Sequence, residues 1–304
     1  MPSEAIILAN KYFVIHYKNS KYSDKIKKLK FYFHDCLIEK FVKIKITSMK
    51  NTLFILLGIL LCSNGVFAQL KAVKYSDGNQ KLNGLSVGPE KGNKTNPGIL
   101  ILPAWKGIDT HAKESAAKLS KMGYYAFVAD IYGEGNYPTT TQEAGKQAGF
   151  YKNNVADYHR RIQLALDQLV KAGANPDTIV VIGYCFGGTG ALEAARAGMK
   201  IQGVVSFHGG LGRDPSRINN PITAKVLVLH GADDTYVPAT EVAAFQQEMR
   251  DTNADWEMIY YANSVHAFTD PEAGNDNSKG AAYNEKAAKK SWERMNSFLK
   301  EVLK

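Results

Sequence analysis

The chain has 304 residues, of which 45% are hydrophobic and 22% charged, and its formal net charge is +9. This apolar content is enough for a packed core and excludes an intrinsically disordered chain. The charge is concentrated at the front, where residues 1 to 48 hold ten lysines against four acidic residues, so the rest of the chain makes no electrostatic case for binding nucleic acid.

Residues 49 to 68 have the pattern of a secretory signal peptide. They begin with Met49 and a lysine, continue with an apolar run over residues 53 to 61, and end with Val66 and Ala68 at the −3 and −1 positions of a cleavage site. The apolar run is shorter than the about 20 residues of a transmembrane helix. We therefore expect no stable membrane insertion.

Three expectations follow for this front part. Translation starts at Met49, residues 1 to 48 are an upstream mis-translated extension, and residues 69 to 304 form the mature, secreted or periplasmic protein. The alternatives are a real basic extension and a lipid anchor on Cys62.

Cleavage after Ala68 would leave Cys185 as the single cysteine of the mature protein, since the other two are Cys36 and Cys62. No internal disulfide and no site of several thiolates is then expected. A lone thiol is a liability in an oxidising compartment. It is therefore either buried and inert or chemically active.

Beyond residue 69, strand and helix patterns alternate. An antiparallel hairpin is expected around Asp77 and Gly78, at a sheet edge. Apolar runs typical of strands lie at residues 97–105, 124–133, 178–185, 203–210, 224–231 and 256–262. Helical patterns lie at residues 110–122, 154–172, about 188–197, 241–250 and 281–303.

This alternation predicts a single α/β domain over residues 69–304, with a mostly parallel central sheet and helices on both faces. The ligand site is expected beyond the carboxyl ends of the strands. Loops at residues 133–151 and 210–220 are expected to shape the pocket.

The stretch Gly-Tyr-Cys-Phe-Gly, residues 183–187, has the form of a strand–turn–helix elbow with a nucleophile at its apex. Such a turn lifts the Cys185 sulfur above the strand end and places it at a helix N-terminus, whose dipole favours the thiolate. Taken alone, this pattern is also typical of glycine-rich strand-to-helix turns that bind phosphate and of turns that bind no ligand.

Two later segments supply an acid and a histidine. Asp233 and Asp234 follow the strand at 224–231, and Asp234 is preferred because it lies midway between Gly231 and Val237. His266 follows the strand at 256–262. Each residue alone is more typical of a turn cap or a solvated loop.

Their order along the chain changes this interpretation. Cys185, Asp234 and His266 follow the order nucleophile, acid, histidine of α/β-hydrolases, and each comes directly after an expected strand. Because parallel strands end at one edge of the sheet, the three side chains are predicted to meet there as a catalytic triad.

On these segments the chain resembles the dienelactone hydrolase family. The matching pieces are "ILILPAWKG", "ADIYG", "VIGYCFGG", "HGADDTYVP" and "NSVHAF", and the resemblance spans about residues 72 to 304. It implies an α/β-hydrolase fold and a triad of Cys185, Asp234 and His266, because a cysteine in the elbow is a hallmark of that family. It also implies an oxyanion hole formed by the backbone N–H groups of Trp105 and Phe186.

Three positions depart from the best-known members of this family. Ala104 stands where those enzymes have a glutamate beside the thiol. Glu134 and Asp270 correspond to arginines that hold a substrate carboxylate. Two acids in place of two cations would repel an anionic lactone, so we expect a substrate other than a dienelactone.

The expected activity is hydrolysis of ester, lactone or thioester bonds in a small-molecule substrate by a monomer. No cofactor and no metal are expected, because the histidines lack ligand spacing. The alternatives are a non-catalytic small-molecule-binding module of the same fold and a redox role for Cys185, which would lack a resolving cysteine.

Three further side chains are assigned lesser roles. His208, which follows a strand, is expected to be a hydrogen-bonded structural histidine, with a place in the pocket wall as the alternative. Tyr132 and Tyr184 are expected to pack rather than to contact the substrate.

Overall fold

The computed structural model describes residues 70–304. The predicted extension over residues 1–48, the predicted signal peptide over residues 49–68 and the alternative of a lipid anchor at Cys62 fall on residues outside the described part of the chain. Within residues 70–304, no helix combines the length and the apolar character that a membrane crossing requires.

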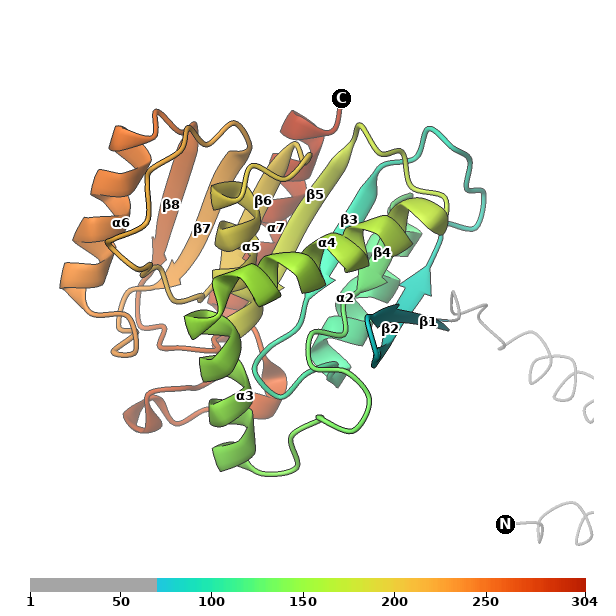
Figure 1. The fold of residues 1–304 in the computed structure, drawn as a ribbon. Helices are drawn as coiled ribbons and strands as arrows, with labels where there is room; N and C mark the ends of the chain where they lie inside the picture. The colour runs from blue at the N-terminus through green and yellow to red at the C-terminus, as the bar shows by residue number, and fades with distance from the viewer. Residues whose placement is uncertain (1–69) are drawn as a thin grey trace, which may run out of the picture. The chain divides into compact units, whose positions relative to one another are not determined.

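A central sheet of eight strands runs through the described residues in the order β1-β2-β4-β3-β5-β6-β7-β8 (Figure 1). The strands are β1 (Lys71–Asp77), β2 (Gln80–Val87), β3 (Gly98–Leu102), β4 (Tyr125–Val128), β5 (Ile179–Tyr184), β6 (Gly203–Phe207), β7 (Lys225–Gly231) and β8 (Trp256–Tyr261). The β1–β2 hairpin is antiparallel and lies at one edge, as expected, and β2 is also antiparallel to β4. From β4 to β8 every neighbouring pair is parallel.

Helices cover both faces of this sheet. They are α2 (Thr110–Lys121), α3 (Thr141–Asn153), α4 (Val155–Lys171), α5 (Phe186–Arg196), α6 (Ala239–Asp251) and α7 (Glu285–Val302), with two 3₁₀ turns, η2 (Pro271–Ala273) and η3 (Asn277–Lys279). In Figure 1, α4, α5 and α6 lie in front of the sheet and α7 lies behind it. The predicted layers are therefore confirmed.

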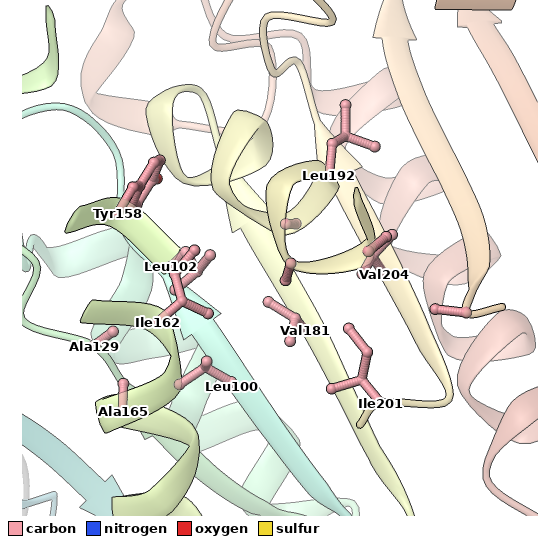
Figure 2. Close-up of a cluster of buried hydrophobic side chains, with 14 of the residues drawn as sticks. Leu100, Leu102, Ala129, Tyr158, Ile162, Ala165, Val181, Leu192, Ile201 and Val204 are labelled. Atoms are coloured by element: carbon pink, nitrogen blue, oxygen red, sulfur yellow. The ribbon is translucent and has the colours of Figure 1, made fainter. Parts of the chain in front are cut away.

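The alternation of side chains along β3 divides the core into two clusters. Leu100 and Leu102 pack with α4 and α5, whereas Ile99 and Ile101 pack with α2 and α7 on the other face. Figure 2 shows the first cluster, in which Ile162 of α4 lies beside the strand residues. A strand that is apolar at every position is covered on both sides, because successive side chains point to opposite faces.

The helix α3 corrects the expected loop at residues 133–151. Thr140 caps it, because the Thr140 hydroxyl accepts from the Glu143 N–H at 3.2 Å and the Glu143 carboxylate accepts from the Thr140 N–H at 3.3 Å. This reciprocal pair was the available sequence signal. Gly145 and Gly149 obscured it, since glycine disfavours a helix interior. Residues 210–220 are irregular, as expected.

Two strands end earlier than their apolar runs predict. β3 stops before Pro103, whose missing N–H cannot extend a ladder, and β4 stops at Val128. The apolar residues beyond these ends leave the sheet at its carboxyl edge. There they form turns that carry part of the candidate site.

Candidate active site

Cys185 lies at the apex of a tight turn between β5 and α5. Its backbone has φ 52° and ψ −115°, a conformation that costs a non-glycine residue free energy and must be imposed by its surroundings. Two hydrogen bonds impose it. The Cys185 N–H donates to the Phe207 carbonyl at 3.0 Å, and the Cys185 carbonyl accepts from the Thr189 N–H at 3.2 Å.

The two glycines that bracket the apex leave no room for a side chain. A Cβ at Gly183 would lie 1.9 Å from the Gly187 oxygen, and a Cβ at Gly187 would lie 2.0 Å from the Leu102 oxygen. Both obstacles are backbone atoms, which move only if the turn itself moves. The elbow therefore requires glycine at both positions, because the backbone approaches itself too closely for a side chain.

The structure brings the three residues of the predicted triad together from the ends of β5, β7 and β8. His266 Nε2 lies 3.0 Å from Cys185 Sγ, and His266 Nδ1 lies 2.9 Å from Asp234 Oδ2. An ionised carboxylate only accepts hydrogen bonds, so Nδ1–H donates to Asp234 and Nε2 faces the sulfur. The Asp234 side chain is 0% exposed, and its other oxygen accepts from the Tyr236 N–H at 2.9 Å.

A later segment of the chain holds His266 in place. The His266 N–H donates to the Gly280 carbonyl at 3.2 Å, and its carbonyl accepts from the Ala282 N–H at 3.0 Å. The imidazole also packs edge-on against Tyr236 and His208, with ring centroids 5.1 and 5.2 Å away. The local sequence around His266 carries no sign of this support.

These contacts favour a thiolate–imidazolium pair. Burial opposes ionisation of Cys185, but the hydrogen bond and the charge of His266, together with the Phe186 N–H, hold the thiol pKa below its ordinary value. Burial also opposes a charged His266, but the bonds to Asp234 and Cys185 raise its pKa to about 10. Both shifts favour a proton on the imidazole and a thiolate at Cys185.

The backbone N–H groups of Phe186 and Trp105 belong to residues that line the cleft at Cys185. Phe186 is the first residue of α5, and its N–H interacts with the Cys185 thiolate. Trp105 lies in the turn after β3, and its N–H has no acceptor within residues 70–304. Both residues line the same cleft as Cys185. An oxyanion hole requires backbone donors that point at the carbonyl oxygen of the substrate; for these two residues that role stays a prediction.

A cleft of about 680 Å³ opens onto Cys185 and His266. Two lysines and three acidic residues line it, namely Lys106, Lys152, Asp109, Asp270 and Glu272. Burial raises the pKa of Asp109, with further contributions from the charges of Asp270 and Glu272. The cleft therefore presents both signs of charge.

Glu134 does not lie in this cleft, contrary to the expectation that it takes the place of a substrate-binding arginine. Its N–H donates to the Lys81 carbonyl at 2.8 Å, and its carbonyl accepts from the Gln80 side chain at 2.9 Å. These bonds tie the residue to β2 instead. Asp270 and Ala104, the other two departures, do line the cleft.

A second group of histidines lies in the cleft wall. His208 Nε2 lies 2.8 Å from Thr269 Oγ1, which lies 3.3 Å from His111 Nε2. Burial holds the pKa of both histidines below its ordinary value, so both are neutral. His208, which is 1% exposed, is hydrogen-bonded as expected and also lines the cleft. Sequence reasoning missed His111, because it lies inside a helix rather than after a strand.

No group of three His, Cys, Asp or Glu side chains in the described part of the chain is arranged to hold a metal ion.

A mostly parallel sheet covered on both faces, with a nucleophile elbow after a central strand, defines an α/β-hydrolase. The family model described as the dienelactone hydrolase family matches residues 82–303, and the chain belongs to that family. The expected fold class and the resemblance are therefore confirmed.

Known proteins that are similar to this chain support the same class. A solved dienelactone hydrolase-like promiscuous phosphotriesterase from metagenomic libraries has a TM-score of 0.73 and 34% identity, over 78% of this chain and 99% of that one. A Bradyrhizobium protein with the name "Probable 2-oxo-3-(5-oxofuran-2-ylidene)propanoate lactonase" is 28% identical, over 57% of this chain and 73% of its own. A Yersinia pestis protein, provisionally named a carboxymethylenebutenolidase, is 23% identical, over 68% of this chain and 79% of its own.

The chain is therefore a hydrolase of ester or lactone bonds of the dienelactone hydrolase type. This outcome does not support the alternative of a non-catalytic binding module.

Proposed function

We propose that this hydrolase works through a covalent acyl-cysteine, with Cys185 as nucleophile, His266 as acid and base, and Asp234 as the group that orients the imidazole. The observation that carries the proposal is the pair of contacts of His266, 3.0 Å to the sulfur and 2.9 Å to the carboxylate. A nucleophile within hydrogen-bond reach of a base that a third group orients is the signature of this chemistry.

Acylation begins with attack of the Cys185 thiolate on the carbonyl carbon of an ester, lactone or thioester. The new C–S bond moves an electron pair onto the carbonyl oxygen, which accepts hydrogen bonds from the Trp105 and Phe186 N–H groups. One such donor is typically worth about 3 kcal/mol. When this intermediate collapses, the bond to the leaving group breaks, and the leaving group takes the Nε2 proton of His266.

Deacylation returns the enzyme to its starting state. His266, now neutral, takes a proton from a water molecule, whose oxygen attacks the thioester carbon. Collapse of the second intermediate breaks the C–S bond, releases the carboxylic acid and leaves the thiolate beside the protonated imidazole.

The cleft supports a substrate other than an anionic dienelactone. Asp270 lines it at a position where a carboxylate-binding arginine is expected in the best-known family members, and Asp109 and Glu272 lie in the same wall. Lys106 and Lys152 line the cleft as well, so polar groups of either sign find a partner. The three acidic side chains would repel an anionic substrate, whereas an uncharged ester or lactone meets no such repulsion. Uncharged esters and lactones are therefore the proposed substrates.

A panel of p-nitrophenyl esters, lactones and thioesters tests this function, with a phosphotriester added because of the activity named for the similar solved structure. The wild-type protein is expected to turn over at least one ester or lactone. The variant Cys185→Ala, which deletes only the sulfur, is expected to lose turnover by about 10³-fold or more and to keep its melting temperature. Undiminished turnover in this variant would contradict the assignment of the nucleophile.

The protein is further assigned to the secreted or periplasmic space as a monomer. The signal-peptide pattern of residues 49 to 68 supports the location, and the supply of all three triad residues by one chain supports the monomer. Mass spectrometry of the exported protein is expected to find Gln69 as the first residue, and an N-terminus upstream of it rules the location out. Light scattering measures the monomer mass.

A further inference from the structure

Tyr132 and Tyr158 each place a hydroxyl on one of the two residues that carry the oxyanion-hole N–H groups. The Tyr132 hydroxyl donates to the Trp105 carbonyl at 2.7 Å, and the Tyr158 hydroxyl donates to the Phe186 carbonyl at 3.0 Å. Both side chains are buried, at 2% and 0% exposure. The sequence had marked Tyr132 as a packing residue only.

The turn that carries Trp105 has few other restraints. One backbone bond, from the Gly107 N–H to the Ala104 carbonyl at 3.0 Å, fixes the peptide plane that contains the Trp105 N–H. The next peptide plane, which contains the Trp105 carbonyl, is fixed by the Tyr132 hydroxyl. The two bonds together set the direction in which the Trp105 N–H points.

The aromatic rings join the two halves of this arrangement. The Phe186 ring stacks on the Tyr158 ring at 4.7 Å with an interplanar angle of 1°, and on the Tyr132 ring at 5.8 Å and 25°. Tyr158 comes from α4 and lies beside Leu102 of β3 in the core (Figure 2). Tyr132 therefore contacts both donor residues, Trp105 through its hydroxyl and Phe186 through its ring.

The hydroxyl of Tyr158 also fits against the backbone of α5. A Cβ at Gly190 would lie 2.2 Å from this oxygen, so the helix approaches it through a glycine. Burial raises the pKa of both tyrosines far above the ordinary value, and the Cys185 charge contributes in each case. Both hydroxyls therefore keep their protons and act as donors.

From these contacts we propose that Tyr132 and Tyr158 are positioning residues of the oxyanion hole, and that Tyr132 sets the separation of its two N–H donors. The inference rests on the proposed function, because it assigns a role at the same site. A displacement of about 1 Å at a reacting centre costs up to roughly 10²-fold in rate. The tyrosines act on kcat, since the donors meet an oxyanion only in the transition state.

Tyr132→Phe tests this role, because it removes the hydroxyl and keeps the ring that stacks on Phe186. Ester hydrolysis is expected to fall roughly 10-fold or more in kcat with KM within about two-fold. Alkylation of Cys185 by iodoacetamide passes through no oxyanion, so its rate is expected to stay within about two-fold of wild type.

Tyr151→Phe is the matched control. Tyr151 lies in the same aromatic cluster, 5.9 Å from Tyr132, and its hydroxyl makes no hydrogen bond within residues 70–304. This variant is expected to keep wild-type hydrolysis and wild-type alkylation. Tyr158→Phe tests the other donor residue, with the same pattern expected as for Tyr132→Phe.

Two results overturn the inference. The first is a kcat of Tyr132→Phe for ester hydrolysis within two-fold of wild type. The second is an equal fall in the rates of hydrolysis and alkylation, which would mean that the hydroxyl acts on the thiolate and not on the oxyanion hole. If Tyr132→Phe does not fold, Tyr158→Phe decides by the same criteria. Failure of the proposed function gives a different result, since wild type and Cys185→Ala would then hydrolyse the ester equally.

Discussion

Cys185 and His266 depend on each other for their protonation states. Burial of the thiol favours its neutral form, and its anion is stabilised by His266 and by the Phe186 N–H. The imidazolium in turn is stabilised by Asp234 and by the thiolate. The ionisation of Cys185 therefore depends on its contacts with His266 and the Phe186 N–H and not on the cysteine alone.

The pH dependence of alkylation by iodoacetamide measures this coupling. Because the pKa of Cys185 is lowered, the thiolate is expected to form below the pH of about 8.5 at which a free cysteine is half ionised. His266 stays protonated up to its raised pKa of about 10, so it stabilises the thiolate throughout this range, and the midpoint of the alkylation profile is expected below about pH 8.5.

His266→Ala is the matching variant for this prediction. It removes the stabilising bond and charge but leaves the burial, which raises the thiol pKa. The midpoint of alkylation is therefore expected to move to about 8.5 or above. Identical profiles for wild type and variant would show that no ion pair forms.

At the scale of the elements, the elbow between β5 and α5 positions the Cys185 sulfur through backbone contacts. Gly187 lets the end of β3 approach the start of α5, and Gly183 lets the start of α5 approach the end of β5, each within the space of a side chain. The position of the sulfur therefore depends on element packing as much as on its own rotamer.

Gly183→Ala tests this dependence. The added Cβ would meet the Gly187 oxygen at 1.9 Å, and relieving that overlap requires the elbow to move. We expect a loss of about 3 kcal/mol in the free energy of unfolding, measured by urea denaturation.

Gly145→Ala is the control for the same measurement. Gly145 lies inside α3 with nothing within 4 Å of an added Cβ. Because alanine favours a helix interior over glycine, stability is expected to rise by about 0.5–1 kcal/mol. Equal stability of Gly183→Ala and wild type would mean that the elbow tolerates a side chain.

Across the domain, a buried ion network connects elements distant in the sequence. Arg196 of α5 donates to Glu193 at 2.9 Å and to Glu248 of α6 at 2.7 Å. Glu193 also bonds His159 of α4 and Arg217 of the loop at residues 210–220, each at 2.9 Å. The network ties three helices and a loop on one face of the sheet.

Because of this network, the free energy of unfolding is expected to depend on pH in the acidic range. Burial opposes ionisation of Glu193, but its bonds to His159 and Arg217 and the charge of Arg196 lower its pKa to about 2. An unfolded glutamate titrates near 4.3. Because the folded pKa is the lower one, the stabilisation is complete above about pH 5 and is lost as the pH falls through 4 toward 2.

Glu193→Gln is therefore expected to lower the free energy of unfolding at pH 7 by a few kcal/mol. The difference from wild type is expected to shrink as the pH falls toward 2, where Glu193 itself becomes protonated. Denaturation curves at pH 7, 4 and 3 measure this, and a difference that stays constant with pH would contradict the role of the charge.

Particular residues show how far sequence reasoning reached. The buried strands, the edge hairpin and the helices on both faces were predicted correctly because each has a local pattern: a continuous apolar run, an alternation around a turn or a helical stripe. Helix α3 was missed because glycines diluted its pattern, although Thr140 and Glu143 marked its start. Glu134 was assigned to the wrong surroundings because the loop that carries it turns back onto β2.

The amino-acid order alone determined the fold class and the candidate triad, since Cys185, Asp234 and His266 each follow a strand and parallel strands end at one edge. Tertiary structure alone decided the distances between them, the support of His266 by residues 280–282, and the tyrosine hydroxyls on Trp105 and Phe186. The physical reason is that periodicity is set by neighbours along the chain. A contact between distant segments is instead set by the packing of whole elements, which no local pattern encodes.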